Sequence, residues 1–95
     1  MPKTTVISAS VDKPFEIALE SNPTTGYQWH PVVDVEALEL KDRSYLAAGE
    51  GIGAGGKERL TFSPRKKGEF VLRLEYRRAW EDQPLATKVF HVRVH

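Results

Sequence analysis

One glycine-rich segment has a pattern that could bind a phosphate group. Residues 51–57 are Gly-Ile-Gly-Ala-Gly-Gly-Lys, which satisfies the G-x-G-x-x-G pattern and most of a phosphate-binding loop. Such a loop binds phosphate where it opens a helix, because the N–H groups at the helix N-terminus receive the anion. Here residues 57–63 alternate like a strand, and Glu58 places a carboxylate where a magnesium-binding Ser or Thr should stand. We therefore interpret the segment as a loop between strands, or as exposed backbone that another protein can approach closely.

The titratable side chains show no pattern of an active site or metal centre. His30, His91 and His95 lack helical metal spacing and a recognisable Asp or Glu partner, so solvated positions are favoured over metal or catalytic roles. The serines lack a nucleophile-elbow context, and the adjacent Glu81 and Asp82 are typical of a turn. Cysteine is absent, which excludes disulfides, thiolate catalysis and cysteine zinc sites. We expect no cofactor and no metal, and we do not expect an enzyme.

Residues 22–26 instead have the properties of a stiff loop. Proline in the middle of Asn22-Pro23-Thr24 blocks this sequence as a glycosylation site. Pro23 fixes its own φ and forces Asn22 into an extended conformation, and Gly26 can adopt the positive φ that closes the turn. The segment is either a narrow polar tip carrying the hydroxyls of Thr24 and Thr25 or an ordinary turn between strands.

The two tryptophans stand in different settings. Trp29 alternates with Tyr27, so we expect it in the core. Trp80 follows the strand that ends near Tyr76 and precedes a turn-rich stretch, with Arg78 close by. Trp and Arg are the residues that most often anchor protein interfaces. Trp80 is therefore either an interface anchor or a side chain that folds back over the end of the sheet.

Strands must position these segments, because the dominant period of the sequence is two. Apolar residues alternate with polar ones, so each run has one buried and one solvated face. The clear runs cover residues 15–20, 60–63, 70–77 and 90–95. A further run begins at Tyr27 and is expected to end at Pro31, and residues 5–10 are a weaker candidate. Residues 34–47 fit neither period, and we predict a strand over residues 37–42 with a short helical turn as the alternative.

These runs predict an all-β fold, an immunoglobulin-like antiparallel β-sandwich of six to eight short strands. Turn-rich clusters separate the runs at residues 12–14, 21–26, 49–56, 64–68 and 81–84. The Cys…Trp…Cys spacing of antibody domains is absent, which excludes a true antibody-type domain. A chain of 95 residues has room for one hydrophobic core, so residues 1–95 are expected to form a single domain.

The charge balance and the apolar runs limit the partners. The chain has 14 Lys and Arg against 13 Asp and Glu, a net charge of +1, whereas a nucleic-acid binder needs a basic surplus. No stretch approaches the roughly 20 apolar residues of a transmembrane helix. The first residues have no apolar region of a signal peptide. We expect no nucleic-acid or membrane partner, and either a cytoplasmic protein or the mature form of a secreted or periplasmic one.

Three segments in chain order resemble the signatures of the chagasin family of cysteine-protease inhibitors. Residues 21–27, Ser-Asn-Pro-Thr-Thr-Gly-Tyr, resemble the first signature, Asn-Pro-Thr-Thr-Gly-aromatic, and residues 53–56 resemble the second, Gly-x-Gly-Gly. Residues 76–80, Tyr-Arg-Arg-Ala-Trp, resemble the third, which usually reads Arg-Pro-Trp. The resemblance extends from about Thr4 to His95. Ala79 departs from the family pattern, and losing the proline frees this loop in the unbound state and weakens binding modestly.

The resemblance implies an immunoglobulin-like fold whose three loops form a wedge that enters the active-site cleft of papain-like cysteine proteases. It implies that Thr24 sits against the catalytic cysteine and histidine and that residues 53–56 run along the non-primed side. It also implies that Trp80, supported by Arg78, packs on aromatic residues of the primed side. The implied protease-binding residues are Asn22, Pro23, Thr24, Thr25, Gly26, Ile52, Gly53, Ala54, Gly55, Gly56, Arg78, Ala79 and Trp80.

The function implied by the resemblance is reversible, tight-binding inhibition of papain-like cysteine proteases by a monomer. The residues support this use, because loops at one end of a sandwich can meet while lying far apart in sequence. The alternative is an immunoglobulin-like adhesion or ligand-binding module that uses the same loop end for another partner.

Overall fold

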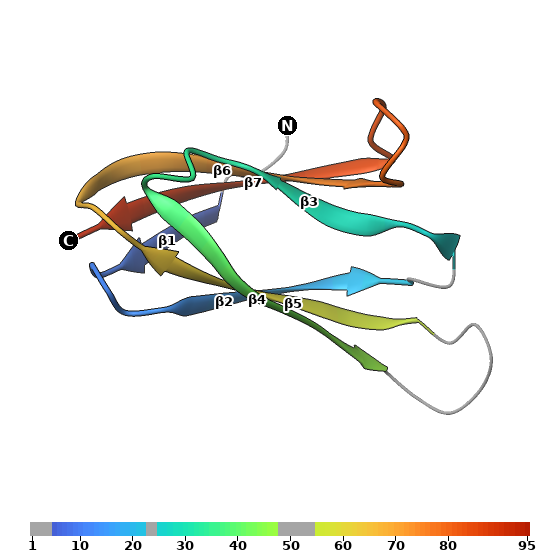
Figure 1. Ribbon diagram of the computed structural model, residues 1–95, viewed down its shortest axis with the longest axis horizontal. Coiled ribbons are helices and arrows are strands. Elements are labelled where there is room, and N and C mark those ends of the chain that lie inside the picture. Colours follow the sequence, from blue (N-terminus) through green and yellow to red (C-terminus); the bar gives the residue numbers. More distant parts are fainter. Residues whose placement is uncertain (1–4, 23–24, 48–54) are drawn as a thin grey trace.

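The computed structural model describes residues 5–22, 25–47 and 55–95, and these residues form seven strands in two facing layers (Figure 1). The strands are β1 (Thr5–Ala9), β2 (Phe15–Ser21), β3 (Gln28–Val32), β4 (Leu38–Ala47), β5 (Gly56–Pro64), β6 (Gly68–Arg77) and β7 (Ala86–Val94). The all-β prediction is confirmed. In the part of the chain that is described, no helix has the length and apolar character needed to cross a membrane.

One layer has the strand order β1-β7-β6-β3, and the other has the order β2-β5-β4. Every pairing is antiparallel except that of β1 with β7, which run parallel. Our expectation of an antiparallel sandwich therefore needs one correction at this edge. Its physical reason is that no hairpin joins the two strands: after β1 the chain crosses to the other layer to begin β2, so no short turn dictates an antiparallel direction.

The core lies between the layers and is built by the alternating residues. Leu60 and Phe62 of β5 and Leu72 and Leu74 of β6 are fully buried, and Phe62 stacks on Phe15 with ring centroids 5.8 Å apart. Full burial of such a side chain contributes about 1.5–3 kcal/mol relative to exposure. Trp29 of β3 is also buried, which confirms its predicted place in the core.

Strand β3 passes through Pro31, where we expected it to end, and continues to Val32. Pro31 lies opposite Leu74 in the register of β3 with β6. The strand tolerates the proline because β3 is the edge of its sheet, where a missing N–H costs no ladder hydrogen bond on the open side.

Strand β4 is longer than the predicted 37–42 segment and starts one residue later, at Leu38. A turn precedes it, in which the Asp34 carbonyl accepts the N–H groups of Ala37 and Leu38, each at 3.0 Å. The register of β4 with β5 shifts between Leu40 and Asp42. This β-bulge moves later side chains to the opposite face, which explains why residues 34–47 followed no single period.

Candidate functional site

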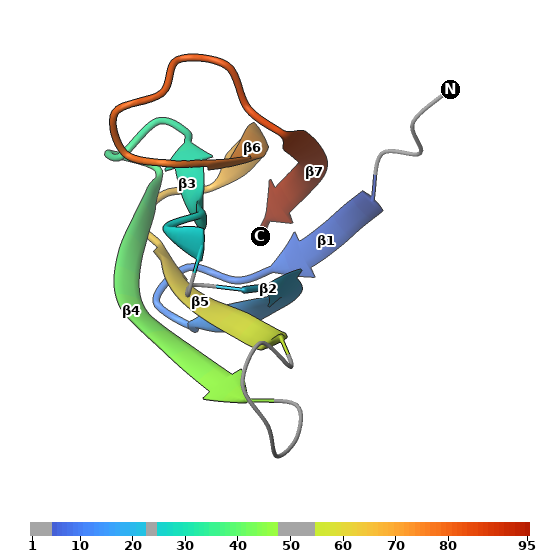
Figure 2. The same ribbon diagram turned by 90° about the vertical axis from the view of Figure 1, so that its right-hand side faces the viewer.

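Three connections leave the strands at one end of the sandwich, which we call the loop end. They are residues 22–27 between β2 and β3, residues 48–55 between β4 and β5, and residues 78–85 between β6 and β7. The loop-end termini of β2, β3, β5 and β6 lie at the right of Figure 1, and Figure 2 looks onto this end of the molecule. The strands that lead into the first two connections are joined by their register, because Gly56 of β5 pairs with Ser21 on one side and with Ala47 on the other.

The structure brings eight of the thirteen predicted site residues to this end. The described ones are Asn22, Thr25, Gly26, Gly55, Gly56, Arg78, Ala79 and Trp80. The other five predictions lie outside the described residues, namely Pro23, Thr24, Ile52, Gly53 and Ala54. The glycine-rich segment leads directly into β5, as its interpretation as a loop before a strand requires.

The first connection is closed by its own hydrogen bonds. The N–H and the hydroxyl of Thr25 both donate to the Asn22 carbonyl, at 3.2 and 2.7 Å. Gly26 has a φ of 84°, which glycine adopts without strain, so its predicted role in the turn is confirmed. From β6, the Tyr76 hydroxyl accepts the N–H of Asn22 at 3.0 Å. The connection is thus tied at its base to the opposite layer.

The third connection begins with a tight turn. The N–H of Glu81 donates to the Arg78 carbonyl at 3.1 Å, which places Ala79 and Trp80 at the two central positions of the turn. The Arg77 guanidinium donates to the Arg78 and Glu81 carbonyls at 3.4 and 3.3 Å. These bonds brace the loop although Ala79 replaces the proline of the family pattern.

Trp80 is 76% exposed at the tip of this turn. It does not fold back over the end of the sheet, and its role as an interface anchor stays a prediction. Large exposed aromatics beside arginine are typical of surfaces that bind another protein.

Arg78 joins the first and third connections. Its Nε donates to the Thr25 carbonyl at 3.1 Å, and its guanidinium lies 4.6 Å from the centre of the Tyr27 ring. The same guanidinium is 6.0 Å from the Trp80 ring. A cation over an aromatic face contributes about 0.5–1 kcal/mol at an exposed site. The side chain therefore holds two connections of the loop end in contact before any partner binds.

An aromatic stack supports the loop end from below. Tyr76 lies between two rings, with its centroid 5.3 Å from that of Tyr27 and 4.8 Å from that of Trp29. The Trp29 indole N–H donates to the Glu20 carbonyl at 3.0 Å. Sequence reasoning gave Tyr76 no site role, although its alternation with Leu74 already predicts that it faces the core.

Glu58 is a buried carboxylate near the loop end, only 4% exposed. It forms an ion pair with Arg43 of β4, and its Oε2 accepts the backbone N–H of Trp29 at 3.3 Å. The sequence contains the signal that would have found it, because Glu58 is in phase with the buried Leu60 and Phe62.

The histidines show one difference from expectation. His91 and His95 are exposed, as predicted, whereas His30 is half-buried and its Nε2 donates to the Arg77 carbonyl at 3.1 Å. Burial lowers the pKa of His30 from its ordinary value of 6.5, and the positive charge of Arg77 lowers it further. No cluster of three metal-ligating side chains occurs within residues 5–22, 25–47 and 55–95.

Residues 8–94 match the sequence profile described as Chagasin family peptidase inhibitor I42. The chain belongs to the chagasin family. This family consists of peptidase inhibitors and not of enzymes, in agreement with the prediction from the sequence. The match covers all three signature segments and supports the inhibitor interpretation over the adhesion or ligand-binding module.

A relative of similar sequence agrees with this assignment, and two solved structures share the fold. Amoebiasin-1 of Entamoeba histolytica is 40% identical over 79 residues, which cover 80% of this chain and 76% of the relative. The crystal structure of the cysteine protease inhibitor EhICP2 from Entamoeba histolytica superposes with a TM-score of 0.83 at 24% identity, covering 97% of this chain and 87% of that one. The structure of PbICP-C in complex with falcipain-2 gives a TM-score of 0.68 at 21% identity, over 99% and 91% of the two chains. This chain is a chagasin-family inhibitor of cysteine proteases.

Proposed function

We propose that this chain is a reversible, tight-binding inhibitor that fills the active-site cleft of papain-like cysteine proteases with the three connections of the loop end. The observation that carries the proposal is Trp80, which stands 76% exposed on a turn that Arg78 ties to the Thr25 carbonyl. A similarly folded protein, PbICP-C, was determined in complex with falcipain-2. That complex supports the choice of partner.

The proposed mechanism assigns one task to each connection. Thr24 lies against the catalytic cysteine and presents a side chain there, so the nucleophile meets no carbonyl carbon that it could acylate. The glycines of residues 53–56 let the main chain lie close to the enzyme on the non-primed side. Trp80 packs on aromatic residues of the primed side and carries much of the binding energy.

Preorganisation supports tight binding. Ordering a mobile side chain on association costs about 0.5–1.5 kcal/mol. In the free chain Arg78 is already held by Thr25 and Tyr27, and the base of the first connection is already held by Tyr76. The cost of arranging these groups is therefore met during folding rather than on association.

We further propose that residues 1–95 act as a single domain and as a monomer, without a nucleic-acid or membrane partner. The net charge of +1 supports the last part of this proposal, because it provides no basic surplus to attract polyanions or acidic lipids.

Titration against papain tests the proposal. A fixed amount of papain is incubated with increasing protein, and residual activity is fitted for a tight-binding competitive inhibitor. We expect stoichiometric loss of activity and an unchanged intact mass of the protein after prolonged incubation. Trypsin is the control and should keep full activity. An absence of inhibition at micromolar protein, or rapid cleavage between Thr24 and Thr25, would contradict the proposed mechanism.

A further inference from the structure

Among the described residues, three polar links join the two layers of the sandwich at the loop end. Asn22, which follows β2, donates its N–H to the Tyr76 hydroxyl of β6 at 3.0 Å. Trp29 of β3 contributes two links, through its indole to the Glu20 carbonyl of β2 at 3.0 Å and through its backbone N–H to Glu58 of β5 at 3.3 Å. The two layers are thus joined by directional bonds where the three connections emerge.

Glu58 differs from the other acceptors because it is charged and buried. It belongs to β5, two residues after Gly56, where the second connection ends. Its Oε1 pairs with Arg43 of β4, and its Oε2 accepts from Trp29 of β3. This carboxylate of β5 therefore contacts β4, the other strand that flanks the second connection, and β3, the strand that follows the first.

Stability alone does not account for such a group. Replacing a buried ion pair by well-packed apolar residues of similar volume is often neutral or stabilising, because removing both charges from water costs free energy. A buried acceptor does, however, restrict geometry, since it is costly whenever its donor moves out of reach. An apolar contact between β3 and β5 would tolerate sliding that the bond from Trp29 to Glu58 does not.

We propose that Glu58 is a positioning residue, which fixes β3 against β5 and so sets the separation of the first and second connections before a protease binds. The inference rests on the proposed function, because it is the cleft of the protease that requires this separation. Glu58 touches no protease atom in this scheme and acts through Trp29 and Arg43.

The first test removes the acceptor without leaving a charge unpaired. The double variant Glu58→Leu with Arg43→Met should stay folded, with a melting temperature lowered only by the cost of leaving the Trp29 N–H without an acceptor. Its inhibition constant for papain should rise about tenfold, the loss that one buried hydrogen bond carries. A second double variant, Glu58→Gln with Arg43→Met, keeps a carbonyl acceptor for Trp29 and should inhibit within about threefold of the wild type. This conservative rescue distinguishes positioning from a general loss of packing.

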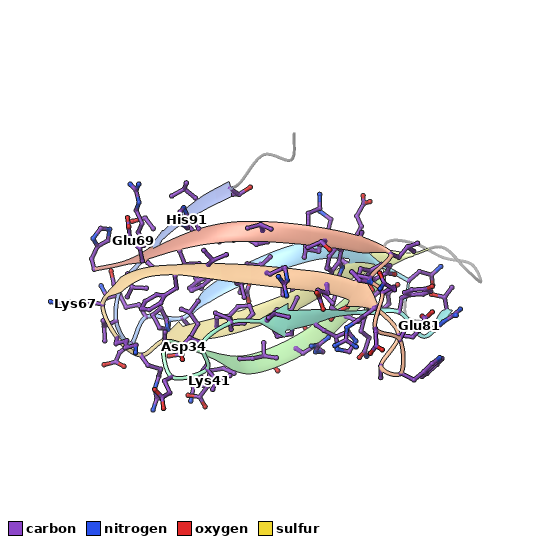
Figure 3. The ribbon with its side chains drawn as sticks, turned by 90° about the horizontal axis from the view of Figure 1, so that it is seen from above. Asp34, Lys41, Lys67, Glu69, Glu81 and His91 are labelled. Carbon is purple, nitrogen blue, oxygen red and sulfur yellow. The ribbon has the colours of Figure 1, made fainter. Side chains whose placement is uncertain are left out.

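The matched control removes another ion pair between neighbouring strands. Arg93 of β7 and Glu69 of β6 are 3.1 Å apart and exposed, and Figure 3 shows Glu69 at the end of the molecule opposite to Glu81. Arg93→Met with Glu69→Leu should leave papain inhibition unchanged. Equal inhibition by both Glu58 variants and the wild type would overturn the proposal, and so would an equal loss in both.

A measurement on the free protein separates this inference from the proposed function. Amide hydrogen exchange, followed by NMR, reports the bond from Trp29 directly. The Trp29 amide should exchange faster in the Glu58→Leu double variant than in the wild type and should stay protected in the Glu58→Gln double variant. If the wild type does not inhibit papain-like proteases, the proposed function fails while the exchange result still decides the role of Glu58. If the Glu58→Leu double variant does not fold, a folded Glu58→Gln double variant that loses either Trp29 protection or inhibition overturns the inference, and one that retains both supports it.

Discussion

Replacing Trp80 with alanine should separate binding from folding. Trp80 is 76% exposed, so a quarter of its surface is covered in the free protein. A tryptophan can bury up to about 250 Å², and the covered part is therefore about 60 Å². At about 25 cal/mol per Å², the folded state loses at most about 1.5 kcal/mol.

The exposed part of the side chain sets the effect on binding. About 190 Å² remain for a partner, which corresponds to an upper limit of about 5 kcal/mol. Ordering the side chain offsets about 0.5–1.5 kcal/mol of this. We therefore expect Trp80→Ala to weaken papain binding by about 2–4 kcal/mol, or about 30- to 1000-fold.

Thermal melting and papain titration of the same variant test these numbers. The melting temperature should fall by no more than about 10 °C, since 1 kcal/mol shifts a domain of this size by about 4–8 °C. Val71→Ala is the control, because Val71 is 55% exposed on β6 and should affect neither measurement strongly. A destabilisation of about 3–5 kcal/mol with unchanged inhibition would refute the reasoning, since that pattern belongs to a core side chain.

Three further substitutions test other parts of the loop end. Ala79→Pro should increase the free energy of unfolding by about 0.4–1 kcal/mol and so raise the melting temperature slightly, because the second position of a tight turn accepts proline. Papain inhibition should stay the same or become tighter. A drop in both measurements would show a different backbone course. Gly55→Val should weaken inhibition in the papain titration, because we propose that the main chain of this connection lies close to the protease, and a side chain obstructs that approach. The fold should be kept, because a Cβ at Gly55 lies 3.4 Å from its nearest neighbour, the Ser21 carbonyl. Unchanged inhibition would favour a passive connection. His30→Gln keeps a donor for the Arg77 carbonyl and should reduce the loss of melting temperature between about pH 7.5 and pH 5. The pKa of His30 is lowered by folding, so its stabilising contribution is present above 6.5 and is lost as the pH falls through the lower value of the folded state; equal pH profiles would contradict this assignment.

The fold was predictable where alternation is uninterrupted. In β6 the buried Leu72 and Leu74 alternate with exposed neighbours, so the sequence alone identifies strand and face. The same reasoning failed in β4, where a bulge follows Leu40. One extra residue there moves the later side chains to the other face of the sheet, and the composition of the strand gives no sign of it. The parallel pairing of β1 with β7 was also missed, since strand direction depends on the crossover of the whole chain and not on either strand.

The site was predictable from its motifs but not from its contacts. The segments around Gly26 and Trp80 could be identified by residue type and spacing. The bond from Arg78 to the Thr25 carbonyl could not, because it joins residues 53 positions apart and depends on how two layers bring their loops together. The exposure of Trp80 was undecidable for the same reason.

The parallel pairing of the first and last strands has a consequence for the order of folding and opening. Thr5 lies opposite Phe90, so this contact closes nearly the whole chain and carries the largest loop-closure entropy of any strand pair. The β1–β7 pair is therefore expected to form late and to open early in local unfolding. β1 pairs only with residues 90–94 of β7, whereas the third connection enters β7 at Ala86. Transient release of β1 thus leaves the loop end intact. The protein therefore keeps its proposed binding surface during local unfolding of β1.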